Sequence, residues 1–542
     1  MRKFSSYGPV NTNLHYYVPR QELVDRACQQ LIGEEPDEGG HYITVWAPRQ
    51  RGKTWVMREV LWRLQKDERF DVLKLNLEHL KRTTDVDRIV QKIAQEIAEA
   101  LDLDITVRVL DELSTVFKKD VLDKPLILIL DEFDALPPQA ISGIAGVFRN
   151  IHIQRQDQLD RPSVERDYLL HGMALIGVRA VLGIENQTGS PFNVQRSLHI
   201  PNLTEAQVHE MYHWYKRESG QAVEQAVIDR VFYETQGQPG LVSWLGELLT
   251  ETYNELGQEP LTIAHFEKVF GLALNVLPNN NLLNIVSKAR QEPYQDTVLE
   301  LFRTHKPAEF RYEDPQLNFL YLNGVIDWER VADGKYYAKF PCPFVQKRLF
   351  HYFAGEIAHE GGRLYDPFDD LSDTITETTL DVPALLRRCE TFFRENREWL
   401  FKHAPRRKTD LRLYEAVYHF NLYTYVRDFL HRRHAQVWPE FPTGNGKVDF
   451  IIRYAGQVYA IEVKSFTGAY EYREALGQAA RYGQQLGLTE ITLALFIEAV
   501  DDANRAKYET LYEDNAPFGN GVPFGNSVTG VTVRPVFVET GT

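Results

Sequence analysis

The stretch Ala47-Pro-Arg-Gln-Arg-Gly52-Lys53-Thr54 decides the fold of the N-terminal half of this chain. It follows a short apolar run, 42–46, and opens a segment with helical spacing. Where a strand, a glycine-containing turn and a helix follow one another in this order, the backbone N–H groups of the connecting loop can cradle phosphates. Lys53 is then expected to reach the β and γ phosphates, and the Thr54 hydroxyl to hold Mg²⁺. The pattern departs from the usual one at Ala47, where glycine is common.

An acidic motif follows a second strand-like run. Residues 126–130 are five consecutive apolar residues, typical of a central parallel strand, and Asp131 and Glu132 come directly after them. Ligands of open α/β sheets bind at the carboxyl ends of the strands. We therefore expect Asp131 to bind Mg²⁺ directly or to hydrogen-bond to one of the ion's ligands. We expect Glu132 to orient the attacking water. An acidic first turn of a helix is the alternative, which the upstream phosphate loop disfavours.

The spacing of apolar residues predicts an α/β multidomain chain with a P-loop core built on a parallel sheet. Thr204 and Gln207 predict a capping box at the start of a helical lid. Residues 324–327 and 336–339 predict a strand–turn–strand pattern, as in a winged helix, whereas residues 518–542 suggest no element. The expected domains are the ATPase core 1–203, the lid 204–275, a winged-helix module 276–355, a linker 356–381 and a C-terminal domain 382–542.

Two β-rich runs in the C-terminal domain flank a short turn. If that turn is the two residues 455–456, Asp449 faces Glu462 across the hairpin, and Lys464 projects from the same face. Two such carboxylates would bind a hard divalent cation, Mg²⁺ or Mn²⁺, which activates water at a scissile phosphate. Lys464 would position the water or stabilise the transition state. A cross-strand salt-bridge cluster is the alternative interpretation.

Both regions resemble known families. Residues 7–350 resemble the AAA-like ATPases, in the branch found beside or fused to nucleases of the PD-(D/E)XK superfamily. The resemblance implies that the segment His15-Tyr16-Tyr17-Val18-Pro19-Arg20 packs on the adenine and that Arg179 senses the γ-phosphate. It also implies that the turn containing Pro239 approaches the nucleotide base. Arg149 and Arg155 are the candidates for an arginine finger, and a solvated helix face is the alternative for both.

The C-terminal domain resembles the PD-(D/E)XK nucleases over residues 405–500, which implies a restriction-endonuclease-like α/β fold. The Asp449, Glu462 and Lys464 pattern is similar to the Asp…Glu-x-Lys core of that superfamily. The resemblance further implies that Glu415 is an additional metal-site acid and that Gln478 faces the active site. A surface position on an amphipathic helix remains the alternative for both residues.

Charge and cysteine content bear on partners and compartment. The net charge of the 542 residues is −15, yet residues 402–481 carry 13 Lys and Arg against 8 Asp and Glu, which indicates a local polyanion site. Three scattered cysteines fit a reducing compartment, and no apolar run is long enough to span a membrane. The N-terminus lacks the order of a signal peptide. We therefore expect a cytoplasmic protein without a membrane partner.

These features predict an ATPase and a Mg-dependent nuclease in one chain, with ATP and Mg²⁺ or Mn²⁺ as cofactors. The partner is expected to be nucleic acid, with DNA ahead of RNA, and the ATPase domain is expected to form a homo-oligomer. Defence against phage or mobile DNA follows from the family resemblance only. The alternative is a nucleotide-switched oligomeric binding or assembly protein whose C-terminal domain binds nucleic acid without cleaving it. A DNA-translocating motor is less favoured, because the chain has a single ATPase core.

Overall fold

A computed structural model of the chain divides into two compact units. The first comprises Met1–Ile285, Phe310–Asp327 and Pro341–Pro343, and the second comprises Val286–Glu309, Trp328–Phe340 and Phe344–Thr542. The predicted winged-helix module is thus shared between the units, and the domain boundaries remain predictions. None of the described helices is long and apolar enough to cross a membrane. The structure describes residues 1–6, 11–35, 37–177, 196–255, 257–302, 308–331, 334–357, 364, 370–401, 404–407, 412–431, 433, 435–442, 447–513 and 529–541.

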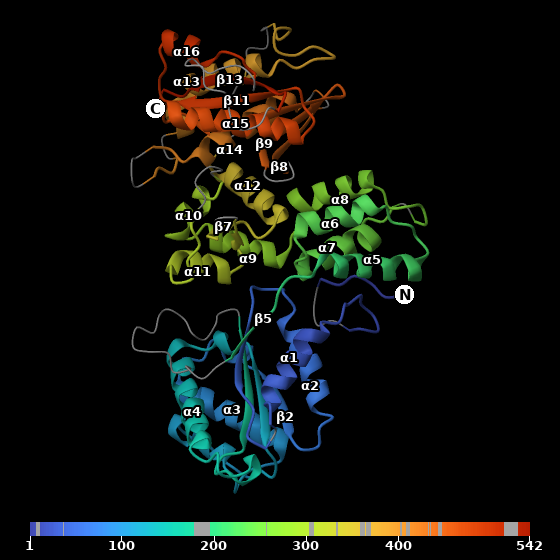
Figure 1. Ribbon diagram of the computed structural model, residues 1–542, viewed down its shortest axis with the longest axis vertical. Helices are drawn as coiled ribbons and strands as arrows, with labels where there is room; N and C mark the ends of the chain where they lie inside the picture. Colours follow the sequence, from blue (N-terminus) through green and yellow to red (C-terminus); the bar gives the residue numbers. More distant parts are fainter. Residues whose placement is uncertain are drawn as a thin grey trace. The chain divides into compact units, whose positions relative to one another are not determined.

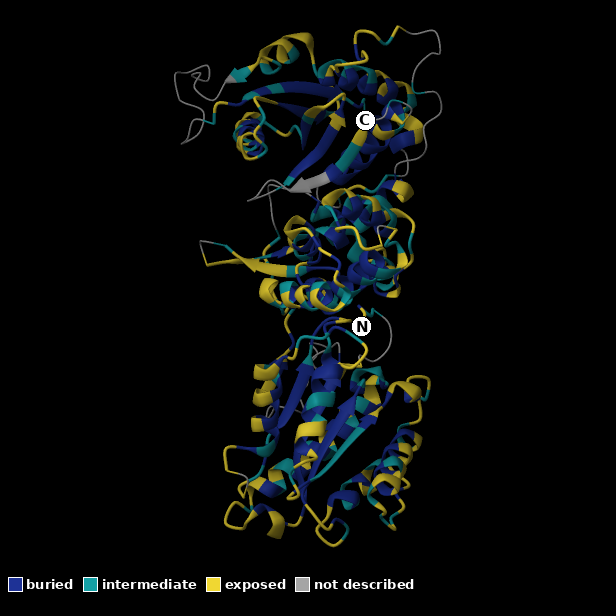
Figure 2. Cartoon of the chain, turned by 90° about the vertical axis from the view of Figure 1, so that its right-hand side faces the viewer, coloured by how far each residue is buried: buried dark blue, intermediate teal, exposed yellow. Residues whose placement is uncertain are grey.

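The predicted parallel sheet of the first unit is confirmed. Its strands are β1 (Tyr42–Trp46), β2 (Asp71–Asn76), β3 (Leu126–Asp131), β4 (Leu170–Gly177) and β5 (Arg196–His199). They lie in the order β2-β3-β4-β1-β5, and all neighbouring pairs are parallel. Every residue of β3 is buried, which explains its unbroken apolar run. In Figure 2 the inner strands of this sheet, β1, β3 and β4, are dark blue because nearly all of their residues are buried.

Helices cover both faces of this sheet (Figure 1). They are α1 (Gln21–Ile32), α2 (Lys53–Leu64), α3 (Val86–Leu101) and α4 (Pro138–Gln156), with short 3-10 helices at Glu78–Leu80, Leu110–Phe117, Phe133–Ala135 and Ser163–Glu165. α1 and α2 share one apolar core with the sheet, and α3 and α4 share the other. Successive strand residues alternate between the two cores, because side chains along a strand point to opposite faces.

The predicted lid, residues 204–275, consists of helices joined by short connections. It contains α5 (Glu205–Ser219), α6 (Gln225–Thr235), α7 (Pro239–Glu247), a π-helical turn over Leu248–Thr252 and α8 (Ile263–Asn275). Thr204 and Gln207 form the predicted capping box, with each side chain bonded to the other residue's backbone. Pro239 occupies the first turn of α7, where a missing N–H costs nothing.

The next segment contains α9 (Asn280–Ala289), α10 (Tyr294–Glu300), α11 (Pro315–Leu322), β6 (Asp327–Arg330), β7 (Tyr336–Lys339) and α12 (Pro343–Ile357). β6 and β7 form a two-stranded sheet, but β6 begins later than the predicted 324–327. Gly324 has φ of +73° and its N–H bonds back to the carbonyl of Tyr321, so it ends α11 instead of starting a strand. Val325 and Ile326 are fully buried in the connection.

The second unit is built on a six-stranded mixed sheet in the order β12-β13-β11-β10-β9-β8. Its strands are β8 (Gln436–Pro442), β9 (Lys447–Tyr454), β10 (Gln457–Ser465), β11 (Glu490–Ile497), β12 (Tyr512–Glu513) and β13 (Thr532–Glu539). Its helices are α13 (Val382–Phe401), α14 (Glu415–Leu430), α15 (Ala469–Gln485) and α16 (Asp502–Tyr508). α15 packs on one apolar core of the sheet. β13 falls in the stretch to which the sequence assigned no element, and it pairs in parallel with β11.

Candidate functional site

The loop between β1 and α2 has the geometry of a phosphate-binding loop. Gly52 has φ of +89° directly before the first residue of α2, a conformation that favours glycine. Lys53 is 8% exposed, and its ammonium donates to the carbonyls of Ala47 at 2.7 Å and Pro48 at 3.1 Å. Thr54 is exposed on the first helical turn. The lysine therefore lies folded across the loop that a polyphosphate would fill.

Burial sets the electrostatics of this loop. It lowers the pKa of Lys53 to about 8, against the opposing effect of nearby carboxylates, of which Asp134 has the largest influence. A polyphosphate would supply the negative charge that favours the protonated amine. Binding of nucleotide and full protonation of Lys53 are therefore coupled.

The acids at the end of β3 are held in different ways. Asp131 is 1% exposed; its Oδ2 accepts from Lys74 Nζ at 2.7 Å and its Oδ1 from the N–H of Glu132 at 3.1 Å. Since both oxygens have protein donors, a water-mediated contact is the simpler route from Asp131 to Mg²⁺. Glu132 is partly buried with φ of +57°, and burial, with Asp134 and Asp131, raises its pKa.

Asp134 is a neighbour of the phosphate loop that the sequence analysis did not select. A Cβ added to Gly177, the last residue of β4, would lie 2.7 Å from the Asp134 carboxylate. The side chain therefore occupies the end of β4 and also influences Lys53. The signal was available, because Asp134 is the third acid of the same motif.

The loop is also tied to distant segments of its own unit. Arg51 is buried, and its Nη2 lies 3.3 Å from Asp327 Oδ2, at the first residue of β6. On the lid, the N–H of Gly240, next to Pro239, donates to the carbonyl of Gln50 at 3.3 Å. The Pro239 turn thus adjoins the phosphate loop, and its approach to the nucleotide base remains a prediction.

The remaining predicted nucleotide residues have separate outcomes. Tyr17 donates from its hydroxyl to Glu59 at 2.7 Å, its ring lies edge-on to Trp55, and burial raises its pKa. Arg179 lies outside the described residues. Arg155 is wrong as an arginine finger, because it is 3% exposed and donates inside the unit to the Tyr168 carbonyl and to Ser163.

The hairpin of the second unit has the predicted register. Ala455 and Gly456 both have positive φ, as the two-residue turn of a tight hairpin requires, and the pairing extends to Ile461 opposite Phe450. Asp449 and Glu462, the next pair outward, are therefore on one face. This geometry follows from the two-residue turn alone.

The three predicted catalytic side chains are buried together. Asp449, Glu462 and Lys464 are 1%, 0% and 3% exposed. Lys464 Nζ lies 2.5 Å from Glu462 Oε1 and 3.8 Å from Asp449 Oδ2, and Asp449 Oδ2 accepts from the N–H of Val463 at 2.6 Å. The structure thus brings them within contact distance, and their catalytic roles remain a prediction.

Helix α14 adds an acid and a histidine to this group. Glu415 is 5% exposed, so the surface alternative for it is wrong, and its Oε2 accepts from the N–H of Ser465 at 3.0 Å. His419, one turn further along, is fully buried, with Nδ1 3.7 Å from Asp449 Oδ1 and Nε2 4.0 Å from Glu415 Oε1. The sequence analysis missed His419, although its i+4 spacing from Glu415 was a usable signal. We call Glu415, His419, Asp449, Glu462 and Lys464 the buried cluster.

Several polar atoms of the buried cluster face each other without hydrogen bonds. Among the described residues, no hydrogen-bond partner exists for either ring nitrogen of His419, for Asp449 Oδ1 or for Glu462 Oε2. Buried polar atoms are normally paired, so such a group suits a bound cation. Carboxylate oxygens fit Mg²⁺ or Mn²⁺, and an imidazole nitrogen suits Mn²⁺ in particular.

The acids of the buried cluster titrate very differently. Burial, and then the neighbouring Asp449, raise the pKa of Glu462 to about 8. Burial alone would raise the pKa of Asp449 too, but His419 and Lys464 outweigh it and hold that pKa below its ordinary value. The pKa of Lys464 is raised, because the two acids outweigh its burial. In the absence of a metal, these effects favour the protonated form of Glu462 over that of Asp449.

Gln478 and Tyr482 on α15 complete the surroundings. Gln478 Nε2 donates to the Tyr482 hydroxyl at 2.7 Å. Burial raises the pKa of Tyr482, and Glu462 adds to the effect, so this pair lies beside the buried cluster. Gln478 is partly buried.

Comparison with known proteins gives one family match, in the first unit. Residues 5–258 match a family described as an AAA-like domain. This part of the chain is similar to AAA-like domains and has the parallel-sheet core of a P-loop ATPase; we call it the AAA-like domain. The family match supports ATP as the ligand of the AAA-like domain. The matched segment ends at residue 258, well before the buried cluster. No curated protein matches the sequence.

Solved structures similar to the chain include two archaeal proteins. The ORC1 protein of Aeropyrum pernix, solved in complex with DNA, is 16% identical, with 62% of this chain and 93% of that chain covered and a TM-score of 0.32. A Walker-type ATPase of Pyrococcus abyssi is 14% identical, with 64% and 98% covered and a TM-score of 0.38.

Proposed function

We propose that the AAA-like domain binds and hydrolyses ATP to control a metal-dependent nuclease in the second unit. The observation that carries this proposal is the buried cluster, where three acids surround one lysine and one histidine. Burying an ionised group costs several kcal/mol unless it is paired. A divalent cation would supply the missing positive charge and occupy the atoms that lack hydrogen bonds.

The residues of the buried cluster divide the work of phosphodiester cleavage. Asp449, Glu462 and Glu415 would hold Mg²⁺ or Mn²⁺, with His419 as a nitrogen donor. When bound, the ion would activate water and stabilise charge on the phosphate. Lys464 keeps its proton because the acids raise its pKa, so it would donate to the attacking water or a phosphate oxygen. Gln478 would orient the substrate or the water from α15.

In the AAA-like domain, ATP would draw Lys53 away from the Ala47 and Pro48 carbonyls and onto its phosphates. Thr54 would bind Mg²⁺, and Glu132 would orient the attacking water. We further propose a homo-oligomer formed through this domain and a nucleic acid substrate, with DNA first, for which the basic segment 402–481 offers charge. A role in defence against phage or mobile DNA rests on the resemblance to nuclease-associated ATPases.

The test is cleavage of plasmid, linear and single-stranded DNA and of RNA with Mg²⁺ or Mn²⁺, with and without ATP. Glu462→Ala should abolish cutting, whereas Glu474→Gln, an exposed glutamate of the same unit, should leave it unchanged. Lys53→Ala should change the response of cutting to ATP and leave the metal requirement intact. Cutting that survives in Glu462→Ala would reject the nuclease assignment.

A second candidate is a nucleotide-switched binding or assembly protein without turnover. Two observations favour it: alanine begins the phosphate loop, and Lys74 engages the Asp131 carboxylate. Tight binding of ATP and DNA by the wild type, with neither ATP hydrolysed nor DNA cut under any of these conditions, would select this candidate.

A further inference from the structure

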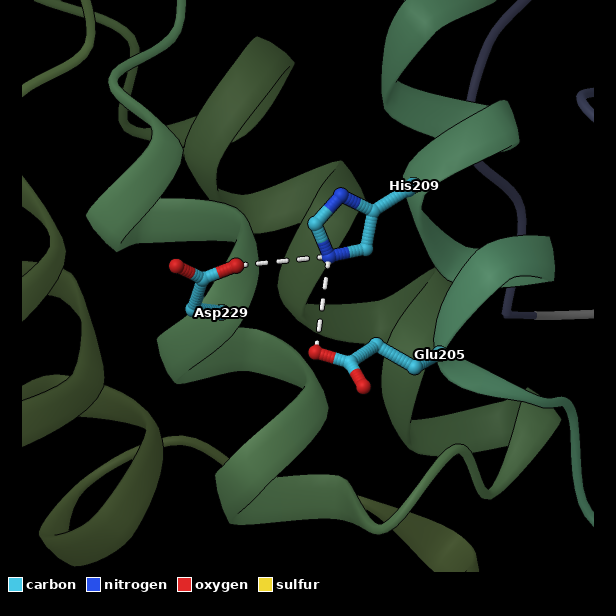
Figure 3. Close-up of side chains that lie close together, drawn as sticks. All are labelled: Glu205, His209 and Asp229. Carbon is cyan, nitrogen blue, oxygen red and sulfur yellow. Dashed lines mark ion pairs between the residues drawn. The ribbon is translucent and has the colours of Figure 1, made fainter.

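Three metal-capable side chains meet on the lid and belong to neither site described above (Figure 3). Glu205 and His209 lie one turn apart on α5, and Asp229 lies on α6. His209 Nε2 is 3.3 Å from Asp229 Oδ1 and 3.9 Å from Glu205 Oε1, and the three possible ligand atoms lie within 4.8 Å of one another. Ligand atoms about 2.1 Å from a tetrahedral ion are about 3.4 Å apart. The three ligand atoms would therefore have to move slightly closer together to match the spacing of ligands around one ion.

The contacts around His209 go beyond those of a simple ion pair. Its Nε2 is shielded from solvent and makes no hydrogen bond in the part of the chain that the structure describes, although two carboxylates approach it. Gln225 Nε2 lies 2.8 Å from Asp229 Oδ1 and 3.1 Å from His209 Nδ1, so one amide orients both groups. In metal sites, side chains that hydrogen-bond to the metal-binding residues hold the imidazole ring and the carboxylate in the orientation that binds the ion.

The surroundings also leave room for an ion with its waters. Glu205, His209 and Gln225 line a hollow of about 580 Å³, with His213 and Lys216 on its wall. The capping box at Thr204 fixes the backbone from which Glu205 projects. Two of the ligands therefore come from one rigid helix and the third from its packed neighbour.

We propose that Glu205, His209 and Asp229 bind a divalent transition-metal ion, with Zn²⁺ as the best fit, and so join α5 to α6. One imidazole and two carboxylates with water in the fourth position is a donor set that Zn²⁺ accepts. Coordination through Nε2 places the proton of His209 on Nδ1. The Gln225 amide, turned by 180°, would accept from that N–H and would give up its hydrogen bond to Asp229 Oδ1, which the ion would then bind instead.

The test is equilibrium dialysis of the full chain against Zn²⁺ alone at neutral pH, with Glu462→Ala in every sample to disable the buried cluster. His209→Ala and Asp229→Asn should each remove one bound zinc, and Gln225→Ala should weaken it by about 10- to 100-fold. The matched control is His79→Ala, because His79 faces a single carboxylate, Glu96, at 3.1 Å. The parent is the protein that carries Glu462→Ala alone. His79→Ala in this background should bind as much zinc as the parent does.

Thermal unfolding gives a second readout of the lid site. Zn²⁺ should raise the melting temperature of the parent and of His79→Ala but not that of His209→Ala. Equal zinc binding by parent and His209→Ala, with the same melting shift, would overturn the proposal. The group would then be an ion pair of protonated His209.

Discussion

Replacing Glu462 with glutamine should remove a proton that the metal-free protein holds and must release when a cation binds. With a pKa of about 8, the Glu462 carboxyl is about nine-tenths protonated at pH 7, so binding of one ion should release about 0.9 proton. Apparent metal affinity should rise about tenfold from pH 7 to above pH 8, equivalent to about 1.4 kcal/mol. In Glu462→Gln, proton release should vanish, because the variant lacks both the titratable proton and one carboxylate ligand of the ion.

The raised pKa of Glu462 also determines how the free energy of unfolding of the second unit changes with pH. The pKa of Glu462 is higher in the folded protein than in the unfolded chain, so it favours folding at low pH. That stability should be lost as pH rises through about 8. The pKa of Asp449 is lowered, so its contribution is lost only when the solution becomes strongly acidic. Between pH 5 and 8 the metal-free second unit should therefore become less stable, and added metal should reverse the trend.

Titration calorimetry with Mn²⁺ and no nucleotide, in two buffers of different ionisation enthalpy, measures the protons released. Repeating it at several pH values separates the titration of Glu462 from other sources. The exposed Glu474→Gln variant is the control and should behave as wild type. Release that is independent of pH, or equal in wild type and Glu462→Gln, would refute this account of the buried cluster.

Three other outcomes are expected in the AAA-like domain. Lys53→Ala should weaken ATP binding by about 10- to 100-fold, measured with a fluorescent ATP analogue, because charge-assisted bonds to phosphate are lost; unchanged affinity would contradict the phosphate loop. Arg155→Ala should destabilise the first unit by about 1–3 kcal/mol in denaturant, because buried acceptors lose their donor. ATPase activity per folded molecule should stay the same, and a selective loss of activity would restore the arginine-finger interpretation. Gly177→Ala should slow ATP hydrolysis, because its methyl group would displace Asp134; Gly146→Ala, where a Cβ meets open space, should not.

The sequence alone determined the features that depend on local spacing. The phosphate loop could be predicted because strand, glycine turn and helix are contiguous, and only Gly52 suits the positive φ before α2. The face shared by Asp449 and Glu462 could be predicted because a two-residue turn fixes the pairing of every later residue.

Tertiary structure alone decided which distant residues meet. The sequence gives no reason for Arg51 to face Asp327, or for His419 to lie between Glu415 and Asp449, because packing of separate elements sets those distances. It likewise left the pairing of β13 with β11 open, since a parallel strand is positioned by a crossover and not by a turn. Local chemistry thus set the composition of each site, and long-range packing set the burial that shifts their pKa values.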